Sequence, residues 1–357
     1  MSRLLIQKLR RQIDQLDKKI VARLNQRARV ALKVGALKAS RQEDLYTPAR
    51  EKILLERLKR KNKGPFPAAA LQSVYREILS ASRALRAPMT VAYLGPEATF
   101  THMASLKHFG RSCQMVPAVS IARVFEEVEH GRAQCGVVGI ENSTEGVVGA
   151  TLDSFYDSPL KIIAEITLPI THHFMTSGST RGIRRVFSHP QAIGQCRAWL
   201  EENFPQAQIV EVESTARAAA RAAEEKGTAA IASEEAASLY RLRIVQRHIE
   251  DNPNNMTRFV VLGRTSPGRT GKDKTSILFA VKNEVGILYR MLEPFYVEKI
   301  NLTKIESRPL KKKAWEYIFF VDLDGHSAEG RVQKALQELD KKCIFLKLLG
   351  SFPKSRE

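Results

Sequence analysis

The feature that most limits how this chain can fold is an amphipathic pattern near its N-terminus. Apolar residues recur at three- and four-residue spacing through residues 3–39, with no proline and a single glycine at position 35. This period predicts one long helix with a continuous apolar stripe that includes Leu5, Leu9, Ile13, Leu16, Ile20 and Leu24. The shorter helices that follow cannot bury so long a stripe, so we expect two chains to intertwine as a dimer.

Two shorter helices follow. Pro48 marks the start of a second helix, since proline suits the first helical position. Asn62–Pro67 breaks that helix, and a third runs from Ala68 to about Leu85, before Pro88. We therefore expect an all-helical domain over residues 1–88.

This helical segment carries most of the formal net charge of +19. Residues 1–88 hold 22 lysines and arginines against 7 acidic residues, a difference of +15. Such a module could bind nucleic acid, could gather small polyanions by electrostatic steering, or could simply have a solvated helix surface.

Three of the cations are spaced in an informative way. Arg27 and Lys38 are 11 residues apart, which is about three turns, so they share a helix face. Arg10 lies roughly 25 Å from Arg27 along the same helix and cannot join them. A partner chain that runs antiparallel could supply its Arg10 to the pair.

From Met89 the pattern changes to short apolar runs that alternate with helices. Strands are expected at 91–94, 135–140, 186–187, 209–212, 229–231 and 259–262, and helices at 100–109, 120–130, 192–203, 214–226 and 234–240. This alternation predicts an α/β domain of doubly wound type over residues 89–266. The longer run Leu160–Thr176 is a candidate crossing between two lobes, as in periplasmic-binding-protein folds.

Polar segments follow several of these strands, where α/β folds bind ligands. They are Gly95–Thr99, Glu141–Gly146 and Ser188–Gln191. A further polar loop, Asn252–Met256, delivers Thr257 and Arg258 to the mouth of a buried strand. A hydroxyl beside a guanidinium there is suited to a small anion.

The C-terminal part reads as a third domain. Thr265–Lys274 has the composition of a linker, and its glycine spacing does not match a nucleotide-binding loop. The order strand, helix, strand, strand, helix, strand over residues 274–357 predicts a ferredoxin-like α+β fold.

Composition excludes several protein classes. No run of about 18 apolar residues suggests a membrane span, and the N-terminus lacks a secretory apolar core. Four widely spaced cysteines form neither a disulfide framework nor a zinc pattern, so we expect a cytoplasmic protein. His172 and His173 would point to opposite faces of a strand, without a third ligand, and with His189 they are expected to be structural. We expect no metal.

The polar segments and the Thr257-Arg258-Phe259 stretch, in this order, resemble the prephenate dehydratase family. The helical segment is similar to chorismate mutases, and the C-terminal domain resembles an ACT domain. The whole chain thus resembles the bifunctional family of phenylalanine biosynthesis, which isomerises chorismate to prephenate and then converts prephenate to phenylpyruvate. The resemblance implies no cofactor, and no nucleic-acid or membrane partner.

The mutase resemblance implies a chorismate pocket. Its members are Arg10 from the partner chain, Arg27, Lys38, Thr47, Arg50, Glu51, Ser82 and Arg86. Thr47 replaces an aspartate common in the family, and Arg86 replaces a glutamine or glutamate near the ether oxygen of chorismate. The reaction needs no nucleophile or metal, because the protein has only to hold a dicarboxylate and stabilise developing charge.

The dehydratase resemblance implies a site made of Asn142, Ser188, Gln195, Thr257 and Arg258. Thr257 would donate to the departing hydroxyl or position the donor, and Arg258 would hold a carboxylate. Ala98 stands where the family usually has glycine, so a positive φ at that position would strain it.

The ACT resemblance implies that L-phenylalanine binds as an effector. Two motifs would hold it: Gly286, Ile287 and Leu288, then Glu306, Ser307, Arg308 and Pro309. Val285 and Ile287 replace the commoner proline and alanine of the first motif.

A second interpretation is a two-lobed small-molecule sensor with ACT control and a basic nucleic-acid-binding arm. A sensor would not need the set of Arg10, Arg27, Lys38 and Glu51. Formation of phenylpyruvate from chorismate would distinguish the enzyme from the sensor.

Overall fold

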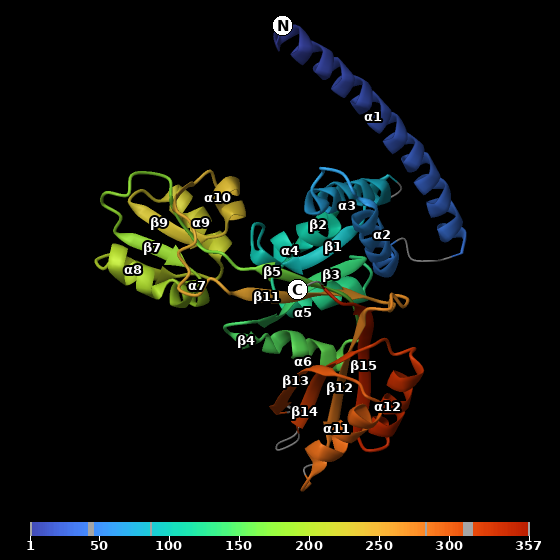
Figure 1. Ribbon diagram of the computed structural model, residues 1–357. Coiled ribbons are helices and arrows are strands. Elements are labelled where there is room, and N and C mark those ends of the chain that lie inside the picture. The colour runs from blue at the N-terminus through green and yellow to red at the C-terminus, as the bar shows by residue number, and fades with distance from the viewer. Residues whose placement is uncertain (1, 42–45, 86–87, 283, 310–316, 356–357) are drawn as a thin grey trace. The chain divides into compact units, whose positions relative to one another are not determined.

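The computed structural model describes residues 2–41, 46–85, 88–282, 284–309 and 317–355. The chain separates into two compact units, whose elements are labelled in Figure 1. The first unit comprises residues 1–89 and 109–114, and the second comprises residues 90–108 and 115–357. Within the described residues, no helix is long and apolar enough to cross a membrane.

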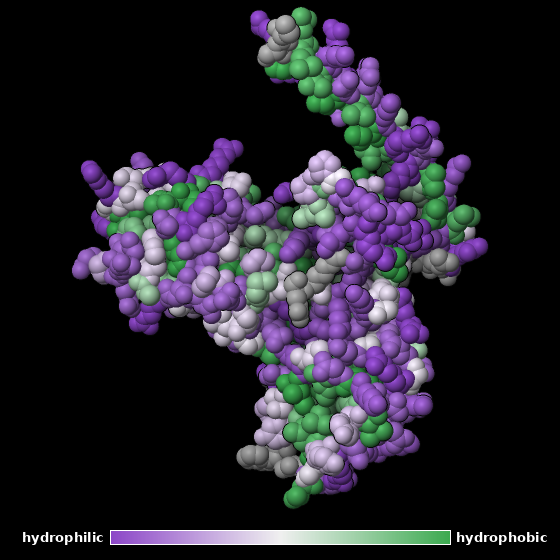
Figure 2. All heavy atoms as spheres, viewed as in Figure 1, coloured by the Kyte–Doolittle hydropathy of each residue, from purple (hydrophilic) through white to green (hydrophobic). Residues whose placement is uncertain are grey.

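The first unit contains the three expected helices, α1 Ser2–Ser40, α2 Pro48–Lys61 and α3 Ala68–Ala84. Proline occupies the first turn of α2, as predicted. The apolar stripe of α1 lies open along the helix, and Ile13, Leu16 and Ile20 are 55%, 56% and 55% exposed. Figure 2 shows this stripe as a band of apolar side chains along α1. So large an apolar face needs a partner surface in water.

The second unit begins with an α/β lobe, called lobe 1 here. Its sheet has the order β2-β1-β3-β11-β5, with β4 paired to β3. The strands are β1 Thr90–Leu94, β2 Gln114–Ala118, β3 Cys135–Asn142, β4 Gly146–Val147, β5 Lys161–Pro169 and β11 Met256–Gly263, and the helices are α4 Phe100–Phe109, α5 Ile121–Glu129 and α6 Gly149–Asp157. β1 and β3 are parallel, whereas β11 is antiparallel to β3 and β5.

Lobe 2 has a second sheet, in the order β10-β6-β9-β7-β8. Its strands are β6 His173–Thr176, β7 Arg185–Ser188, β8 Gln208–Glu211, β9 Thr228–Ala232 and β10 Arg243–Gln246, and its helices are α7 Pro190–Gln195, α8 Arg197–Asn203, α9 Thr215–Glu224 and α10 Glu234–Leu239. The helix expected at 192–203 is two helices. Asp251 separates them, because its N–H donates to the Gln195 carbonyl (2.7 Å) and its carboxylate accepts from Ala198 N (3.2 Å).

The chain crosses between the lobes twice. The first crossing joins β5 to β6, which confirms the prediction for Leu160–Thr176, and the second joins β10 to β11 through residues 247–255. The crossings are hydrogen-bonded to each other, since Ile170 N donates to the Asn255 carbonyl at 2.8 Å. Two α/β lobes joined by two crossings have the predicted binding-protein-like architecture.

The C-terminal segment, which resembles an ACT domain in sequence and is called the ACT segment here, has the predicted ferredoxin-like order. It consists of β12 Asp273–Val281, α11 Ile287–Val297, β13 Leu302–Pro309, β14 Tyr317–Asp324, α12 Gly330–Asp340 and β15 Phe345–Pro353. The strands form an antiparallel sheet in the order β13-β14-β12-β15.

This sheet shares a hydrophobic core with lobe 1. Leu278, Phe320, Leu349 and Phe352 belong to the same buried cluster as Phe155 and other residues of α5 and α6. β15 approaches β5 so closely that a Cβ at Gly350 would overlap the carbonyl oxygen of Ile162. Sequence alone gives no sign of this joint core.

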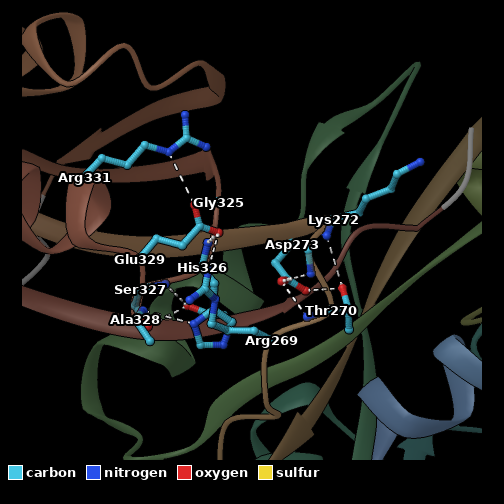
Figure 3. Close-up of polar contacts among 12 residues, drawn as sticks. Arg269, Thr270, Lys272, Asp273, Gly325, His326, Ser327, Ala328, Glu329 and Arg331 are labelled. Atoms are coloured by element: carbon cyan, nitrogen blue, oxygen red, sulfur yellow. Dashed lines mark hydrogen bonds and ion pairs between the residues drawn. The ribbon is translucent and has the colours of Figure 1, made fainter.

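The predicted linker is a fixed turn (Figure 3). Asp273 is 3% exposed, and its carboxylate accepts from Thr270 N at 2.8 Å and Gly271 N at 3.1 Å. His326 Nδ1 accepts from Ala328 N, so its Nε2 carries the proton and donates to the Pro267 carbonyl at 3.1 Å. The turn therefore docks onto the ACT segment.

Candidate active sites

A cleft of about 860 Å³ opens between lobes 1 and 2. Three of the five predicted dehydratase residues line it, namely Asn142, Gln195 and Thr257. The loops after β1, β3, β7 and β8 supply most of the remaining wall. The carboxyl ends of strands from both lobes thus meet at one ligand-sized space, as expected for such folds.

Thr257 enters the cleft from the start of β11, where it pairs with Asn142 of β3. Asn142 Oδ1 accepts from two backbone amides, Thr144 N at 2.9 Å and Glu145 N at 3.0 Å. Its Nδ2 must therefore be the donor, and it donates to Thr257 Oγ1 at 2.7 Å. Because Thr257 accepts this bond, its own hydroxyl proton is available to a ligand, and no described residue accepts it.

Asn255 and Gln195 extend this network. Asn142 Nδ2 also donates to Asn255 Oδ1 at 2.7 Å, and Asn255 Nδ2 donates to Gln195 Oε1 at 2.6 Å. Gln195 Nε2 in turn donates to Glu145 Oε1 at 3.3 Å. Asn255 is 1% exposed and was not among the predicted site residues. Its place in the polar loop before Thr257 was the one available signal.

Two histidines that the sequence marks as structural also line the cleft, His172 and His189. Burial lowers the pKa of both, so their rings are neutral near pH 7. His172 Nε2 lies 3.0 Å from Gln195 Oε1, whereas its Nδ1 is buried and has no hydrogen-bond partner among the residues that the structure describes. The rings of Phe100 and His172 pack edge to face, with their planes at 84° and their centroids 5.6 Å apart.

The other two predicted dehydratase residues lie elsewhere. Ser188 is fully buried, and its Oγ donates to the Ile231 carbonyl at 2.8 Å. Arg258 follows Thr257 but projects from the opposite face of β11, as strand geometry requires. Its NH1 lies 2.5 Å from Asp322 Oδ2.

Arg258 belongs to an ion cluster between lobe 1 and the ACT segment. Its three cations are Arg258, Lys274 and Lys304, and its three carboxylates are Glu141, Glu165 and Asp322. Burial alone would lower the pKa of Arg258, but Asp322 and Glu165 outweigh burial and raise it. The charges balance, so the guanidinium is matched within the protein.

In the helical unit the structure brings some of the predicted chorismate residues together. Arg27 NH1 donates to Ser82 Oγ at 2.7 Å, and Lys38 Nζ donates to Thr47 Oγ1 at 2.8 Å. The Glu51 carboxylate pairs with Arg83, a residue that the sequence did not single out.

The remaining chorismate residues are apart from these contacts. Arg10 lies on the exposed N-terminal part of α1, and Arg50 is exposed on α2. Arg86 lies outside the described residues, and its predicted contact with the ether oxygen stays a prediction.

The two effector motifs lie at different places on the ACT segment. Gly286 has a φ of 73° before α11, with Ile287 and Leu288 in the first turn of that helix. Glu306, Ser307, Arg308 and Pro309 end β13. Arg308 NH1 donates to the Gly149 carbonyl of α6 at 2.7 Å and lies 3.3 Å from Asp153 Oδ1. Arg308, Glu306 and Pro309 also line a small cavity of about 100 Å³ against α6.

Comparison with known proteins identifies the segments. Residues 9–87 match chorismate mutase type II, residues 91–267 match prephenate dehydratase, and residues 275–341 match the ACT domain. The chain is 50% identical over 355 residues to the bifunctional chorismate mutase/prephenate dehydratase of Aquifex aeolicus, covering 98% of each chain. It is 42% identical over 354 residues to the enzyme of the same name from Pseudomonas aeruginosa, covering 97% of each.

A solved structure agrees. The crystal structure of prephenate dehydratase from Arthrobacter aurescens in complex with L-Phe is 34% identical, with a TM-score of 0.70. The match covers 74% of this chain and 90% of that one. The predicted family and fold class are confirmed: this chain belongs to the family of bifunctional chorismate mutase/prephenate dehydratases.

Proposed function

We propose that the cleft around Thr257 is the prephenate dehydratase site of this enzyme, and that the Thr257 hydroxyl donates to the departing hydroxyl of prephenate. The hydrogen bond from Asn142 Nδ2 to Thr257 Oγ1 carries this proposal. It occupies a lone pair of the threonine and turns the proton toward the cleft. A donor fixed before the reaction begins costs no reorganisation when charge develops.

In this reaction the ring carboxylate leaves as CO2, and its bonding electrons enter the ring. The ring becomes aromatic as the carbon–oxygen bond at the opposite carbon breaks. The hydroxyl leaves with this bonding pair and becomes water by taking one proton from solvent. The Thr257 hydroxyl would stabilise the negative charge that develops on this oxygen. Arg217, in the first turn of α9, lines the cleft and offers positive charge to a substrate carboxylate.

Thr257→Ala tests the donor role. Removing one such donor typically lowers turnover by about 10²–10³, while Thr257→Ser should keep a substantial part of the activity. Supplied with chorismate, Thr257→Ala should accumulate prephenate because the mutase site is separate. Loss of both activities in a folded variant would contradict the assignment.

We propose that chorismate binds the helical unit between two copies of the chain. Arg27, Lys38, Thr47, Glu51 and Ser82 would come from one copy. The exposed stripe of α1 supports a homodimer, which would bring the partner's N-terminal half of α1, with its Arg10, to this pocket. Arg50 and Arg86 complete the proposed set.

We propose that L-phenylalanine binds the ACT segment at its two motifs and inhibits the dehydratase. The L-Phe complex of the Arthrobacter aurescens enzyme supports this effector.

All four cysteines are unpaired in the structure, which supports a reducing cytoplasm as the site of action.

A further inference from the structure

Asn255 sits where the two crossings between the lobes meet. Its backbone carbonyl accepts from Ile170 N at 2.8 Å, and the next two residues begin β11 with Thr257. Its side chain is 1% exposed and is not part of the cleft wall. Its amide oxygen and amide nitrogen are nevertheless hydrogen-bonded to two residues of the cleft wall, Asn142 and Gln195.

The direction of these bonds is fixed by the backbone. Asn142 Oδ1 accepts from Thr144 N and Glu145 N, and a backbone N–H can only donate. Asn142 must then present Nδ2 to Asn255, which must accept with Oδ1 and donate with Nδ2. Each later amide inherits its orientation from the one before it.

The chain of bonds closes on itself. Gln195 accepts from Asn255 with Oε1 and donates with Nε2 to the Glu145 carboxylate, while the Glu145 backbone N–H donates to Asn142. The four residues Asn142, Asn255, Gln195 and Glu145 thus form a ring whose donors all run in one sense. One bond leaves the ring, from Asn142 Nδ2 to Thr257, and one enters it, from His172 Nε2 to Gln195 Oε1.

We propose that Asn255 is a positioning residue of the dehydratase: it accepts from Asn142 Nδ2, passes this orientation on to Gln195, and so holds Asn142 in place as the donor to Thr257. This inference rests on the proposed donor role of Thr257. If the Asn255 amide turned over, Nδ2 would face Nδ2 of Asn142, and Oδ1 would face Oε1 of Gln195. The ring joins lobe 1, through Asn142 and Glu145, to lobe 2, through Gln195, so it also fixes the lobes at the cleft.

The test is Asn255→Asp, which keeps the shape of the side chain and removes the donor to Gln195. A carboxylate would face the Gln195 oxygen, so this bond would be lost and Gln195 would have to turn over or move away. Misplacing a catalytic group slightly can cost about 10²-fold, so dehydratase kcat at pH 8 should fall by about that factor, with a smaller change in KM. Mutase activity of the same protein should be unchanged.

Acidification distinguishes positioning from simple damage. A protonated carboxyl donates to Gln195 as the amide does, and burial disfavours its ionised form. The ratio of N255D to wild-type kcat should therefore rise about tenfold per pH unit as pH falls, until the carboxyl is protonated. The nearby titratable groups, His172, Glu145, Glu250 and Asp251, are present in both proteins, so a pH dependence that they produce alone also appears in the wild type.

Two further variants complete the experiment. Asn254→Asp makes the same chemical change at an exposed neighbour, and it should behave as wild type at every pH. Asn255→Ala should lose activity without regaining it in acid.

The proposal fails if N255D keeps wild-type kcat, or if its loss is equal at all pH values and matches that of N255A. Thr257→Ala, measured in parallel, tests the donor role separately. If T257A is fully active, the proposed function fails whatever N255D shows.

Discussion

Replacing Asp322 tests whether the ion cluster holds the ACT segment to lobe 1. Asp322 is fully buried on β14, and its two oxygens contact Arg258 NH1 and Ser276 Oγ, each at 2.5 Å. Asp322→Ala removes one of three carboxylates and leaves three cations. The cluster would then carry an unmatched positive charge.

The expected cost follows from the geometry. Removing one partner of a buried ion pair typically costs about 3–5 kcal/mol, since the remaining charge is left without compensation. Glu165 and Glu141 lie 3.5 and 3.4 Å from the Arg258 guanidinium and offset part of the loss. We therefore expect the lower end of that range, about 3 kcal/mol, which lowers the unfolding temperature of a unit of this size by roughly 5–10 °C.

Calorimetry of the full chain measures this shift, and hydrogen exchange locates it at β11 and β14. Glu201→Ala is the matched control, because it breaks the Arg197–Glu201 pair, whose side chains are 76% and 68% exposed. Exposed pairs contribute about 0–1 kcal/mol. Asp322→Asn should fall between the two, since it keeps hydrogen bonds without the charge. An Asp322→Ala shift no larger than that of Glu201→Ala would refute the buried-charge argument.

Three other outcomes are expected. Ala98 has a φ of 64°, so Ala98→Val should cost more than about 2 kcal/mol while Ala98→Gly stays near neutral, as denaturant titration can show. Burial lowers the pKa of His172, so below about pH 6.5 the unfolded chain binds a proton at this residue and the folded chain does not. The free energy of unfolding should therefore fall as pH drops, by up to about 1.4 kcal/mol per pH unit. His172→Gln should reduce this pH dependence, as thermal melts at several pH values can show. Placing charge on the α1 stripe with Ile13→Asp should abolish mutase turnover and, in sedimentation, the dimer, while the same change at exposed Leu239 of α10 should not.

Sequence periodicity predicted the helices of the first unit and the ferredoxin-like order of the ACT segment, because these depend on local patterns. The resemblance to dehydratases, not periodicity, singled out Ala98 as a residue that a positive φ would strain, and its φ is 64°. Periodicity missed α6 and β10, whose residues are too mixed in polarity to show a clear period.

Long-range contacts account for the rest. Nothing near Arg258 in the sequence signals that Asp322, 64 residues later, neutralises it. In the sequence Asn255 is one of several asparagines in a polar loop, and only the folded structure shows that it bonds to Asn142 and Gln195. Residues 274–357 looked like a separable domain, yet they complete the core of lobe 1. Deleting them would expose Phe155 and its neighbours, so a point variant is the better way to isolate regulation.

The neighbours Thr257 and Arg258 show how these parts are connected. Successive side chains on a strand point to opposite faces, so β11 presents the hydroxyl to the cleft between the lobes and the guanidinium to Asp322 of the ACT sheet. Interiors are close-packed and transmit displacement. A shift of β14 that moves Asp322 therefore acts on β11 one residue from the proposed donor. Arg308 adds a second connection. It donates to the carbonyl of Gly149, the first residue of α6, which directly follows Val147 and Val148 of the cleft wall. Both β11 and the start of α6, which adjoin the cleft proposed as the dehydratase site, are thus bonded to the ACT segment.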